Sequence, residues 1–355
     1  MNVCSRPYKE CLKIIQVAVL CWLILAPDGT GMASEWNVSG SRAIPEALIY
    51  MDANAEDHPG FTFALLVDKS RQQVRLYRHE GYWQMMEKWP CSTGKLTGPK
   101  EREGDQRTPE GVYFVQRDVE GRYLTQTYGA RALTLDYPNT LDKYMSRSGS
   151  AIWLHGTNKT LQDRNSNGCV VFENETIDRL AQFIRLNRTP IIIVDHIRYR
   201  AARDSQALAD NILEAANQWH DAMMYGSFEA FNQWYGAGAG PSMKWWQKWC
   251  RQRRKAGEGT TYQSVMGQRA IYQCGDHYVL MLDHYLKIAS RSQWIGRRKL
   301  FIRIDKEGNI RILGDAYQTA ACRYTDPLFY VWQELWHAME SHHEVAATFK
   351  NGKNT

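Results

Sequence analysis

The residues most capable of chemistry in this chain of 355 residues are one cysteine and one histidine. Cys169 follows a short polar run and precedes two valines, and His155 ends an apolar segment 14 positions earlier. A thiol attacks a carbonyl as the thiolate, and a nearby imidazole can take its proton and return it. The spacing allows a loop to bring the end of one strand beside the start of the next. The pair therefore predicts nucleophilic catalysis by Cys169 with His155 as its base.

Ordered sequence blocks surround this pair. They are Ser92-Thr93-Gly94, Gly98-Pro99-Lys100, Gly104-Asp105, Arg107-Thr108-Pro109-Glu110-Gly111, His155-Gly156-Thr157 and Ser166-Asn167-Gly168-Cys169. In this order they resemble the L,D-transpeptidase family, also called the YkuD or ErfK family, and its YafK-like members, over residues 61–196. The resemblance implies a β-rich catalytic domain. It also implies cleavage of the bond between an L-centre and a D-residue in a peptidoglycan stem peptide.

The resemblance implies a role for each residue of the two central motifs. Cys169 would form a thioester, His155 would accept its proton, and the carbonyl of Gly156 would orient the imidazole. The backbone N–H groups of Cys169 and Gly168 would face the developing oxyanion, where the loss of one donor typically costs about 10²–10³ in rate. The remaining candidates, for substrate contact or for bracing the loops, are Ser166, Asn167 and Thr157.

Two positions depart from the family pattern. Asn167 stands where many members have His, and Val171 stands where many have Arg two residues after the cysteine. Whatever that Arg does for a substrate carboxylate must then be done elsewhere in this chain or not at all. The candidates are Lys100, Arg107 and Arg164, each of which also fits an ordinary surface charge.

Three functions remain open from the sequence. An amine could resolve the thioester, as in an L,D-transpeptidase, or water could resolve it, as in an L,D-carboxypeptidase that trims tetrapeptides to tripeptides. An inactive wall-binding scaffold is the third, and the intact His155 and Cys169 argue against it. An activated Cys169 should have a pKa below the usual value of about 8.5 and should react fast with thiol reagents near neutral pH. The implied partners are stem peptides and the acceptor, and a homodimer stays open.

The periodicity predicts an α+β fold in two domains. In the first, residues 61–196, strands are expected at 61–67, 83–90, 151–154 and 190–194. Asn174 is expected to cap a helix whose apolar stripe begins at Ile177. A lead-in at 34–60 is expected to be partly helical around 46–51, and a charged connector is expected at 197–206.

The second domain is expected at residues 207–347, before a tail at 348–355. Helices and then long antiparallel strands resemble a nuclear-transport-factor-like (SnoaL-like) cone, an α+β layout found in cell-shape L,D-carboxypeptidases. A terminal helix is expected at 326–344. One basic, aromatic helix follows Ser242. Its tryptophans are expected to face the core and its cations to face water, rather than to bind nucleic acid.

The first 33 residues have the pattern of an export signal. A basic start, an apolar run at 14–26 and the small residues around Gly31 and Ala33 indicate cleavage by a signal peptidase. This predicts export to the periplasm or cell envelope. An uncleaved membrane anchor is the alternative.

The cysteines and the net charge limit the other possibilities. Of eight cysteines, three lie in the expected signal, which leaves Cys169 as the natural free thiol and the pairing of Cys91, Cys250, Cys274 and Cys322 open. No Cys-x-x-Cys spacing indicates a metal site, and no cofactor is expected. A net charge of +6 is modest and gives no nucleic-acid-binding signature.

Overall fold

The computed structural model describes residues 36–38, 41–52, 63–257, 261–288 and 291–319. The expected export signal, the terminal helix at 326–344, the tail at 348–355 and Cys322 lie outside these residues. Among the helices that are described, none has the length and apolar character needed to cross a membrane.

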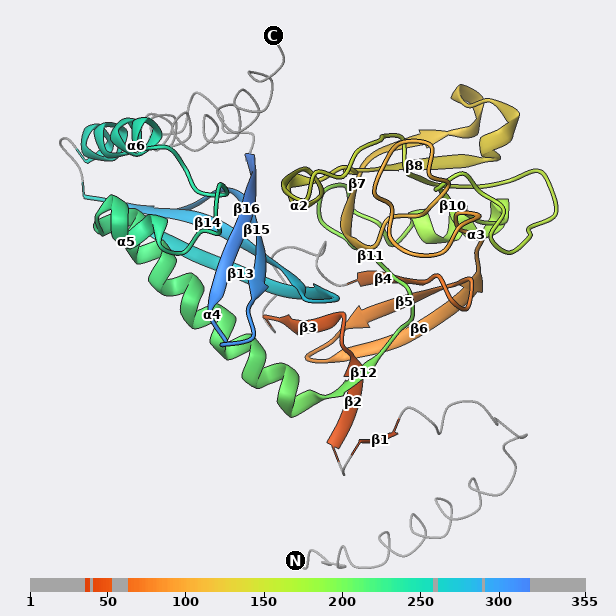
Figure 1. The fold of residues 1–355 in the computed structure, drawn as a ribbon, viewed down its shortest axis with the longest axis horizontal. Coiled ribbons are helices and arrows are strands. Elements are labelled where there is room, and N and C mark those ends of the chain that lie inside the picture. The colour runs from red at the N-terminus through yellow and green to blue at the C-terminus, as the bar shows by residue number, and fades with distance from the viewer. Residues whose placement is uncertain (1–35, 39–40, 53–62, 258–260, 289–290, 320–355) are drawn as a thin grey trace, which may run out of the picture.

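Strands β4 to β11 form an eight-stranded mixed sheet, which makes up one half of the molecule (Figure 1). Its strands lie in the order β10-β9-β8-β7-β11-β4-β5-β6. Their bounds are β4 Phe63–Asp68, β5 Gln73–His79, β6 Trp83–Pro90, β7 Gly111–Glu120, β8 Arg131–Leu135, β9 Trp153–His155, β10 Val170–Val171 and β11 Pro190–Val194. The short helices of this half are η4 Gly121–Tyr123, η5 Gln126–Tyr128, α2 Thr140–Tyr144 and α3 Asn174–Ala181. The strands expected at 61–67, 83–90, 151–154 and 190–194 are therefore confirmed to within two residues.

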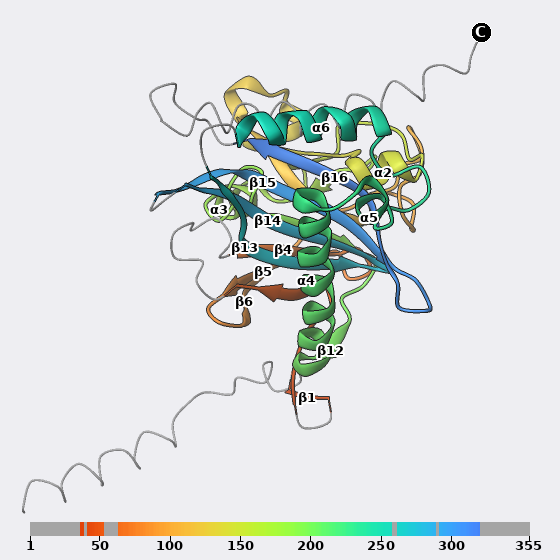
Figure 2. The ribbon, with the colours of Figure 1, turned by 90° about the vertical axis from the view of Figure 1, so that its left-hand side faces the viewer.

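A second, antiparallel sheet combines four long strands with the short strand β3, in the order β16-β15-β14-β13-β3. Its bounds are β3 Leu48–Met51, β13 Gln263–Cys274, β14 His277–Ile288, β15 Arg291–Ile304 and β16 Ile310–Thr319. Three helices pack against one face of this sheet: α4 Ala202–Tyr225, α5 Phe228–Asn232 and α6 Met243–Ala256. Figure 2 shows α4 crossing in front of the strands. A small third sheet joins β1 Trp36–Val38, β2 Ser41–Pro45 and β12 Tyr199–Ala201.

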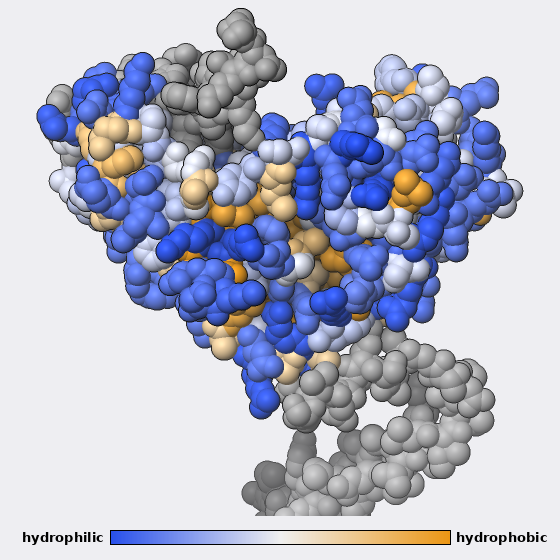
Figure 3. Space-filling model, viewed as in Figure 1, coloured by the Kyte–Doolittle hydropathy of each residue, from blue (hydrophilic) through white to orange (hydrophobic). Residues whose placement is uncertain are grey.

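Three apolar clusters arrange these elements in layers. The central cluster lies between the two large sheets, and it includes Leu66 and Phe114 from one and Tyr272 and Phe301 from the other. Alternate strand residues point away from it, because successive side chains of a strand face opposite sides. On the outer side of the eight-stranded sheet they meet α3, and on the outer side of the five-stranded sheet they meet α4 to α6. The face drawn in Figure 3 is mostly hydrophilic, with apolar surface gathered where the two halves meet.

Two expectations for the segments outside the catalytic region are wrong. Residues 48–51 form strand β3 rather than a helix, and β3 pairs with β13 more than 200 positions later. Leu48 and Ile49 are buried on opposite sides of that sheet, which a strand allows and a surface helix does not. Residues 197–206 are not a bare connector, because they contain β12 and the first turn of α4.

Helix α6 has the arrangement expected from its sequence. Ser242 caps it by accepting a hydrogen bond from the backbone N–H of Trp245. The side chains of Trp245, Trp246 and Trp249 are buried, and Lys244 and Arg251 are exposed. The aromatic residues therefore contribute to the core, as in an ordinary amphipathic helix.

Candidate active site

The register of two short parallel strands brings the candidate nucleophile and base together. In the pairing of β10 with β9, Val170 lies opposite Leu154 and Val171 lies opposite His155. Val170 and Leu154 are fully buried in the core on one face. Because side chains alternate along a strand, Cys169 and Val171 face the other side, together with His155. Cys169 and His155 are therefore diagonal neighbours on one face of the sheet.

That face opens on a cavity of about 680 Å³. Of the residues predicted from the sequence, those that line it are Cys169, His155, Thr157, Ser166 and Asn167. Gly156 and Gly168 lie behind the wall, where their backbone atoms hold its side chains in place. The cavity lies at the edge of the eight-stranded sheet, and neither β13 nor any later strand contributes to its lining.

The ring of His155 has one assignable tautomer. Its Nδ1 lies 2.7 Å from the carbonyl oxygen of Gly156, and a carbonyl only accepts hydrogen bonds. Nδ1 therefore carries the proton, and Nε2 keeps the lone pair that a general base needs. The edge of Tyr128 packs against the imidazole at a ring-centroid distance of 5.0 Å. Burial lowers the pKa of His155, with the hydrogen bond to Gly156 opposing it, so the ring is neutral at neutral pH.

Cys169 is a free, half-buried thiol whose resting state differs from the expected one. Burial raises the pKa of Cys169 above its ordinary value, although a backbone hydrogen bond from Trp153 and the charge of Lys100 oppose this. Its Sγ donates to the carbonyl of Ala151 at 3.6 Å, which is an interaction of the protonated form. The expectation of a depressed pKa is therefore wrong. The site therefore pairs a neutral thiol with a neutral imidazole, because burial disfavours the charged form of each group.

Asn174 supports the histidine motif instead of capping a helix. The N-cap position of α3 belongs to Glu173, and no side chain caps that end. The Asn174 Oδ1 atom accepts from the backbone N–H of Ala130 at 2.8 Å, and its Nδ2 donates to Asn158 at 2.8 Å. A Cβ atom on Gly156 would lie 2.3 Å from Asn174 Oδ1. Glycine at 156 therefore leaves room for the amide that ties the loops around the base together.

Hydrogen bonds on both sides fix the loop before Cys169. Ser166 Oγ accepts from the backbone N–H of Gly168 at 3.1 Å and donates to the carbonyl of Cys169 at 2.6 Å. Gly168 has a φ of +134°, and a Cβ there would lie 2.9 Å from the carbonyl oxygen of Arg107. Because the Gly168 N–H is engaged by Ser166, it is a poor oxyanion donor, contrary to the expectation for it. The N–H of Cys169 is the better candidate.

The three cations considered for substrate carboxylates do not line the cavity. Lys100 is buried and donates to Asp105 at 2.7 Å. Burial opposes ionisation of Asp105, but hydrogen bonds from Lys100 and three backbone N–H groups lower its pKa to about 2. Arg107 lies 3.9 Å from Glu101 and Arg164 is likewise outside the cavity lining. Lys100 and Asp105 thus fix the 100–107 loop.

Two lysines that were not predicted line the cavity in place of Lys100, Arg107 and Arg164. Lys95 and Lys159 both line the cavity and are exposed, and Lys95 donates to Asn167 at 3.3 Å. Neither carries a motif signal, because each stands in a loop of ordinary polar composition. The remaining lining residues that sequence reasoning missed include Tyr128, from the short helix η5, and Asn158 and Asn165, from loops. Only the fold brings these loops to the edge where β9 and β10 meet.

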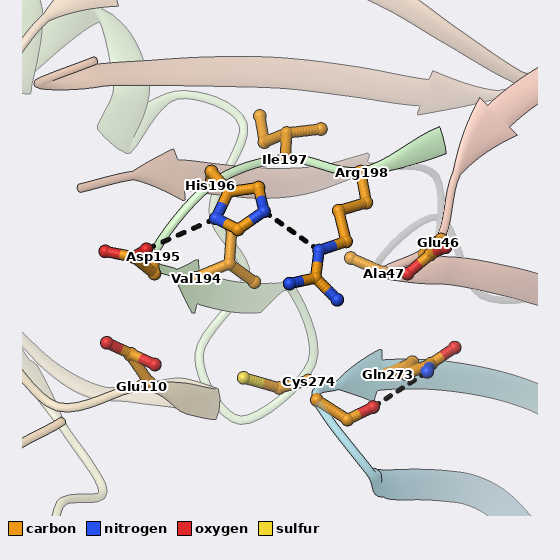
Figure 4. Close-up of a pocket in the computed structure, with 11 residues that line it drawn as sticks. Glu46, Ala47, Glu110, Val194, Asp195, His196, Ile197, Arg198, Gln273 and Cys274 are labelled. Atoms are coloured by element: carbon orange, nitrogen blue, oxygen red, sulfur yellow. Dashed lines mark hydrogen bonds and ion pairs between the residues drawn. The ribbon is translucent and has the colours of Figure 1, made fainter. Parts of the chain in front are cut away.

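A second cavity, of about 220 Å³, lies between the two large sheets (Figure 4). His196 bridges Asp195 and Arg198 on one side, and Glu110 and Cys274 lie on the other. Neither Cys169 nor His155 lines it. No group of three or more His, Cys, Asp or Glu side chains suited to a metal ion occurs in the described part of the chain. Cys91, Cys169, Cys250 and Cys274 are all free there.

The sequence matches a known domain over the region that builds this site. Residues 62–193 match the family model of the L,D-transpeptidase catalytic domain, YkuD. YafK of Escherichia coli K12, whose name assigns it provisionally to the L,D-transpeptidases, is 31% identical over 121 residues. That alignment covers 33% of this chain and 44% of YafK, as does the match to YafK of Escherichia coli O157:H7. The chain thus spans less than half the length of the curated relatives it matches.

Solved structures share the fold over a longer stretch. Bd1075 of Bdellovibrio bacteriovorus superposes with a TM-score of 0.64 at 24% identity, covering 79% of this chain and 100% of that one. The helical cell shape determining protein Pgp2 of Campylobacter jejuni gives 0.57 at 21% identity, covering 76% and 94%. Both likenesses are longer than residues 62–193, so they include part of the chain outside that match. The chain therefore carries a YkuD-type L,D-transpeptidase catalytic domain at residues 62–193, within a strand-rich fold of mixed helices and strands.

Proposed function

We propose that this protein is a cysteine acyltransferase of the cell envelope that acts on peptidoglycan stem peptides. The observation that carries the proposal is the placement of Cys169 and His155 on one face of β10 and β9, lining one cavity. The match of residues 62–193 to the L,D-transpeptidase catalytic domain supports the substrate class. The expected export signal supports the location.

In the first step, Cys169 Sγ attacks the carbonyl of the L-centre that precedes the terminal D-residue. His155 Nε2 accepts the thiol proton as the new S–C bond forms, since both groups start neutral. The C–N bond to the D-residue then breaks, and the imidazolium returns the proton to the departing amine. The product is a thioester on Cys169 and a free D-amino acid. General-base assistance of this kind contributes about 10²–10⁴-fold.

In the second step, an acceptor resolves the thioester. An acceptor amine gives up a proton to His155 and attacks the thioester carbonyl, which forms an L,D cross-link and restores the Cys169 thiol. Water would follow the same path and leave a tripeptide, which is the L,D-carboxypeptidase alternative. Fold relatives that include a cell shape determining protein favour keeping this alternative beside the first. An inactive wall-binding scaffold is the third candidate, and a preserved cavity with both groups argues against it.

The part of the chain after residue 206 fits a supporting domain. Its helices and strands β13 to β16, together with β3 from the N-terminal part of the chain, pack on the opposite side of the eight-stranded sheet from α3. We keep the nuclear-transport-factor-like assignment as a proposal for this domain. None of its described residues lines the cavity, so it would act by placing the catalytic domain on its polymer substrate.

One incubation tests the proposed function and its alternative together. The protein is mixed with purified disaccharide tetrapeptides, alone and with an amine acceptor, and the products are identified by mass. Cross-linked dimers or acceptor adducts indicate a transferase, and tripeptides indicate a carboxypeptidase. The Cys169→Ala variant should give neither. Substrate that stays unchanged with the unsubstituted protein would support the scaffold instead.

A further inference from the structure

Thr108 makes a contact that the steps above do not use. It belongs to the block from Arg107 to Gly111, which contributes no residue to the cavity wall. The side chain of Thr108 is fully buried. Its Oγ1 accepts from the backbone N–H of Gly94 at 2.8 Å and donates to the carbonyl oxygen of Gly168 at 2.9 Å. Because the Gly94 N–H supplies one proton to Oγ1, the hydroxyl proton is directed to Gly168.

The carbonyl of Gly168 and the N–H of Cys169 belong to the same planar peptide group. In a trans peptide these two bonds point in opposite directions, so holding one of them sets the direction of the other. Thr108 holds the carbonyl, and Ser166 holds the preceding N–H of Gly168 at 3.1 Å. The Cys169 N–H is thus aimed by a hydroxyl located on the other side of the peptide.

The backbone of Thr108 is itself firmly held. Its carbonyl accepts from Lys69 Nζ at 2.8 Å, and the same ammonium donates to Gly98 at 2.6 Å and to Glu110 at 2.9 Å. Lys69 is only 1% exposed, and burial lowers its pKa while Glu110 opposes the shift. A buried ammonium with three acceptors ties the loops at 98 and 108 to strand β4, so Thr108 has a rigid base from which to orient its partner.

We propose that Thr108 is a positioning residue for acyl transfer. By holding the Gly168 carbonyl, it keeps the Cys169 N–H directed at the oxyanion that develops when Cys169 attacks. This role rests on the proposed function, because only acyl transfer develops that charge. Alkylation of the same sulfur by iodoacetamide displaces iodide and forms no oxyanion. Loss of the Thr108 hydroxyl should therefore slow acylation of Cys169 and leave its alkylation unchanged.

The experiment compares both reactions on the full chain in three variants. Acylation is followed by intact mass with a carbapenem and with a tetrapeptide, and alkylation is followed with iodoacetamide at the same pH. T108V should acylate about 10–100-fold more slowly, up to the loss expected for one oxyanion donor. Its alkylation rate constant should stay within about twofold of the unsubstituted protein. T108S keeps the hydroxyl and should acylate at nearly the full rate.

Thr189 supplies a matched control. It is also fully buried, and its Oγ1 likewise accepts from a backbone N–H, that of Arg185 at 2.9 Å, and donates to a backbone carbonyl, that of Phe183 at 3.3 Å. T189V should change neither rate, since Thr189 touches no part of the cavity.

Three results would overturn the role of Thr108. Equal losses of acylation and alkylation in T108V would mean general loosening of the site, and full acylation in T108V would mean no role. Slow acylation in T108S, with alkylation kept, would exclude the hydroxyl as the cause even if T108V failed to fold. An unsubstituted protein that alkylates but never acylates would instead contradict the proposed function, and the positioning role with it.

Discussion

His155 Nδ1 lies 2.7 Å from the carbonyl oxygen of Gly156, its own chain neighbour. This contact leaves Nε2 unprotonated, and the hydrogen bond that orients the base comes from a backbone carbonyl rather than from a carboxylate. A neutral carbonyl stabilises an imidazolium less than a carboxylate does, which agrees with the lowered pKa of His155. The candidate base is therefore supported by the backbone around Gly156, rather than by an acidic side chain as the third member of a catalytic triad.

The pH dependence of the two Cys169 reactions should differ. His155 must be neutral to accept a proton, and burial lowers its pKa below 6.5. Acylation should therefore rise with pH through a midpoint below 6.5 and stay level to about pH 8.5. Alkylation requires the thiolate, and burial raises the pKa of Cys169 above 9.0, so labelling should be slow at pH 7 and rise beyond pH 9. Quenched time courses of acylation and of alkylation, each followed across this pH range, measure the two midpoints. A labelling midpoint near pH 6 would show an ion pair and contradict this account.

Removal of the base should cost more than removal of its neighbours. His155→Gln keeps a polar side chain of similar length but cannot take a proton at neutral pH. Acylation of Cys169 should fall by about 10²–10⁴-fold, the usual contribution of general-base catalysis. Tyr128→Phe keeps the ring that packs on His155 and should change the rate little. Single-turnover acylation measures both, and a His155→Gln rate within threefold of the unsubstituted protein would exclude this base.

The effects of substituting Gly156 and Asn174 on the free energy of unfolding should be strongly non-additive. G156A places a Cβ 2.3 Å from Asn174 Oδ1, so it should lower the free energy of unfolding by about 1–3 kcal/mol or more. N174A removes that oxygen along with two hydrogen bonds. The double variant should be more stable than the sum of the two single effects predicts, because the clash is absent. Chemical denaturation of the four proteins measures this. Simple additivity would show that the Cβ does not meet the amide.

Substitution of Lys95 or Lys159 should weaken substrate binding, whereas substitution of Lys100 should lower the stability of the fold. Lys159→Gln and Lys95→Gln change exposed cavity residues, so KM for a tetrapeptide with a free terminal carboxylate should rise about two- to fivefold, the range expected for weak exposed ion pairs. Lys100→Gln breaks a buried ion pair with Asp105, and it should instead cost about 3–5 kcal/mol of stability. Steady-state kinetics and denaturation distinguish the classes. A raised KM for Lys100→Gln at unchanged stability would reverse the assignment.

Local motifs made the central residues predictable. Cys169, His155, Thr157, Ser166 and Asn167 all line one cavity, because two short strands of adjacent sequence bring their motifs to the same edge. Strand β11 was also predictable, since it carries its own run of β-branched residues. In these cases the information lies within a few residues of the element concerned.

The missed features depend on distant partners. Taken alone, residues 48–51 have the pattern of a short helix. They form a strand because they pair with β13, and no local sequence pattern indicates that pairing. Lys100 is a different case, because its partner is near in the sequence. Asp105 lies five positions away and forms a buried ion pair with Lys100, which the residue types alone do not show. The expected direction of the Cys169 pKa shift was also wrong, because the motif indicates a nearby imidazole but not the burial that raises this pKa.

The most direct test of the central claim is the mass of the protein after brief incubation with a disaccharide tetrapeptide and a denaturing quench. The account predicts an adduct equal to the substrate minus its terminal D-residue, mapped to Cys169, released by hydroxylamine and absent from Cys169→Ala. An adduct that persists in Cys169→Ala, or product formation without any adduct at Cys169 on the millisecond to minute scale, would contradict it.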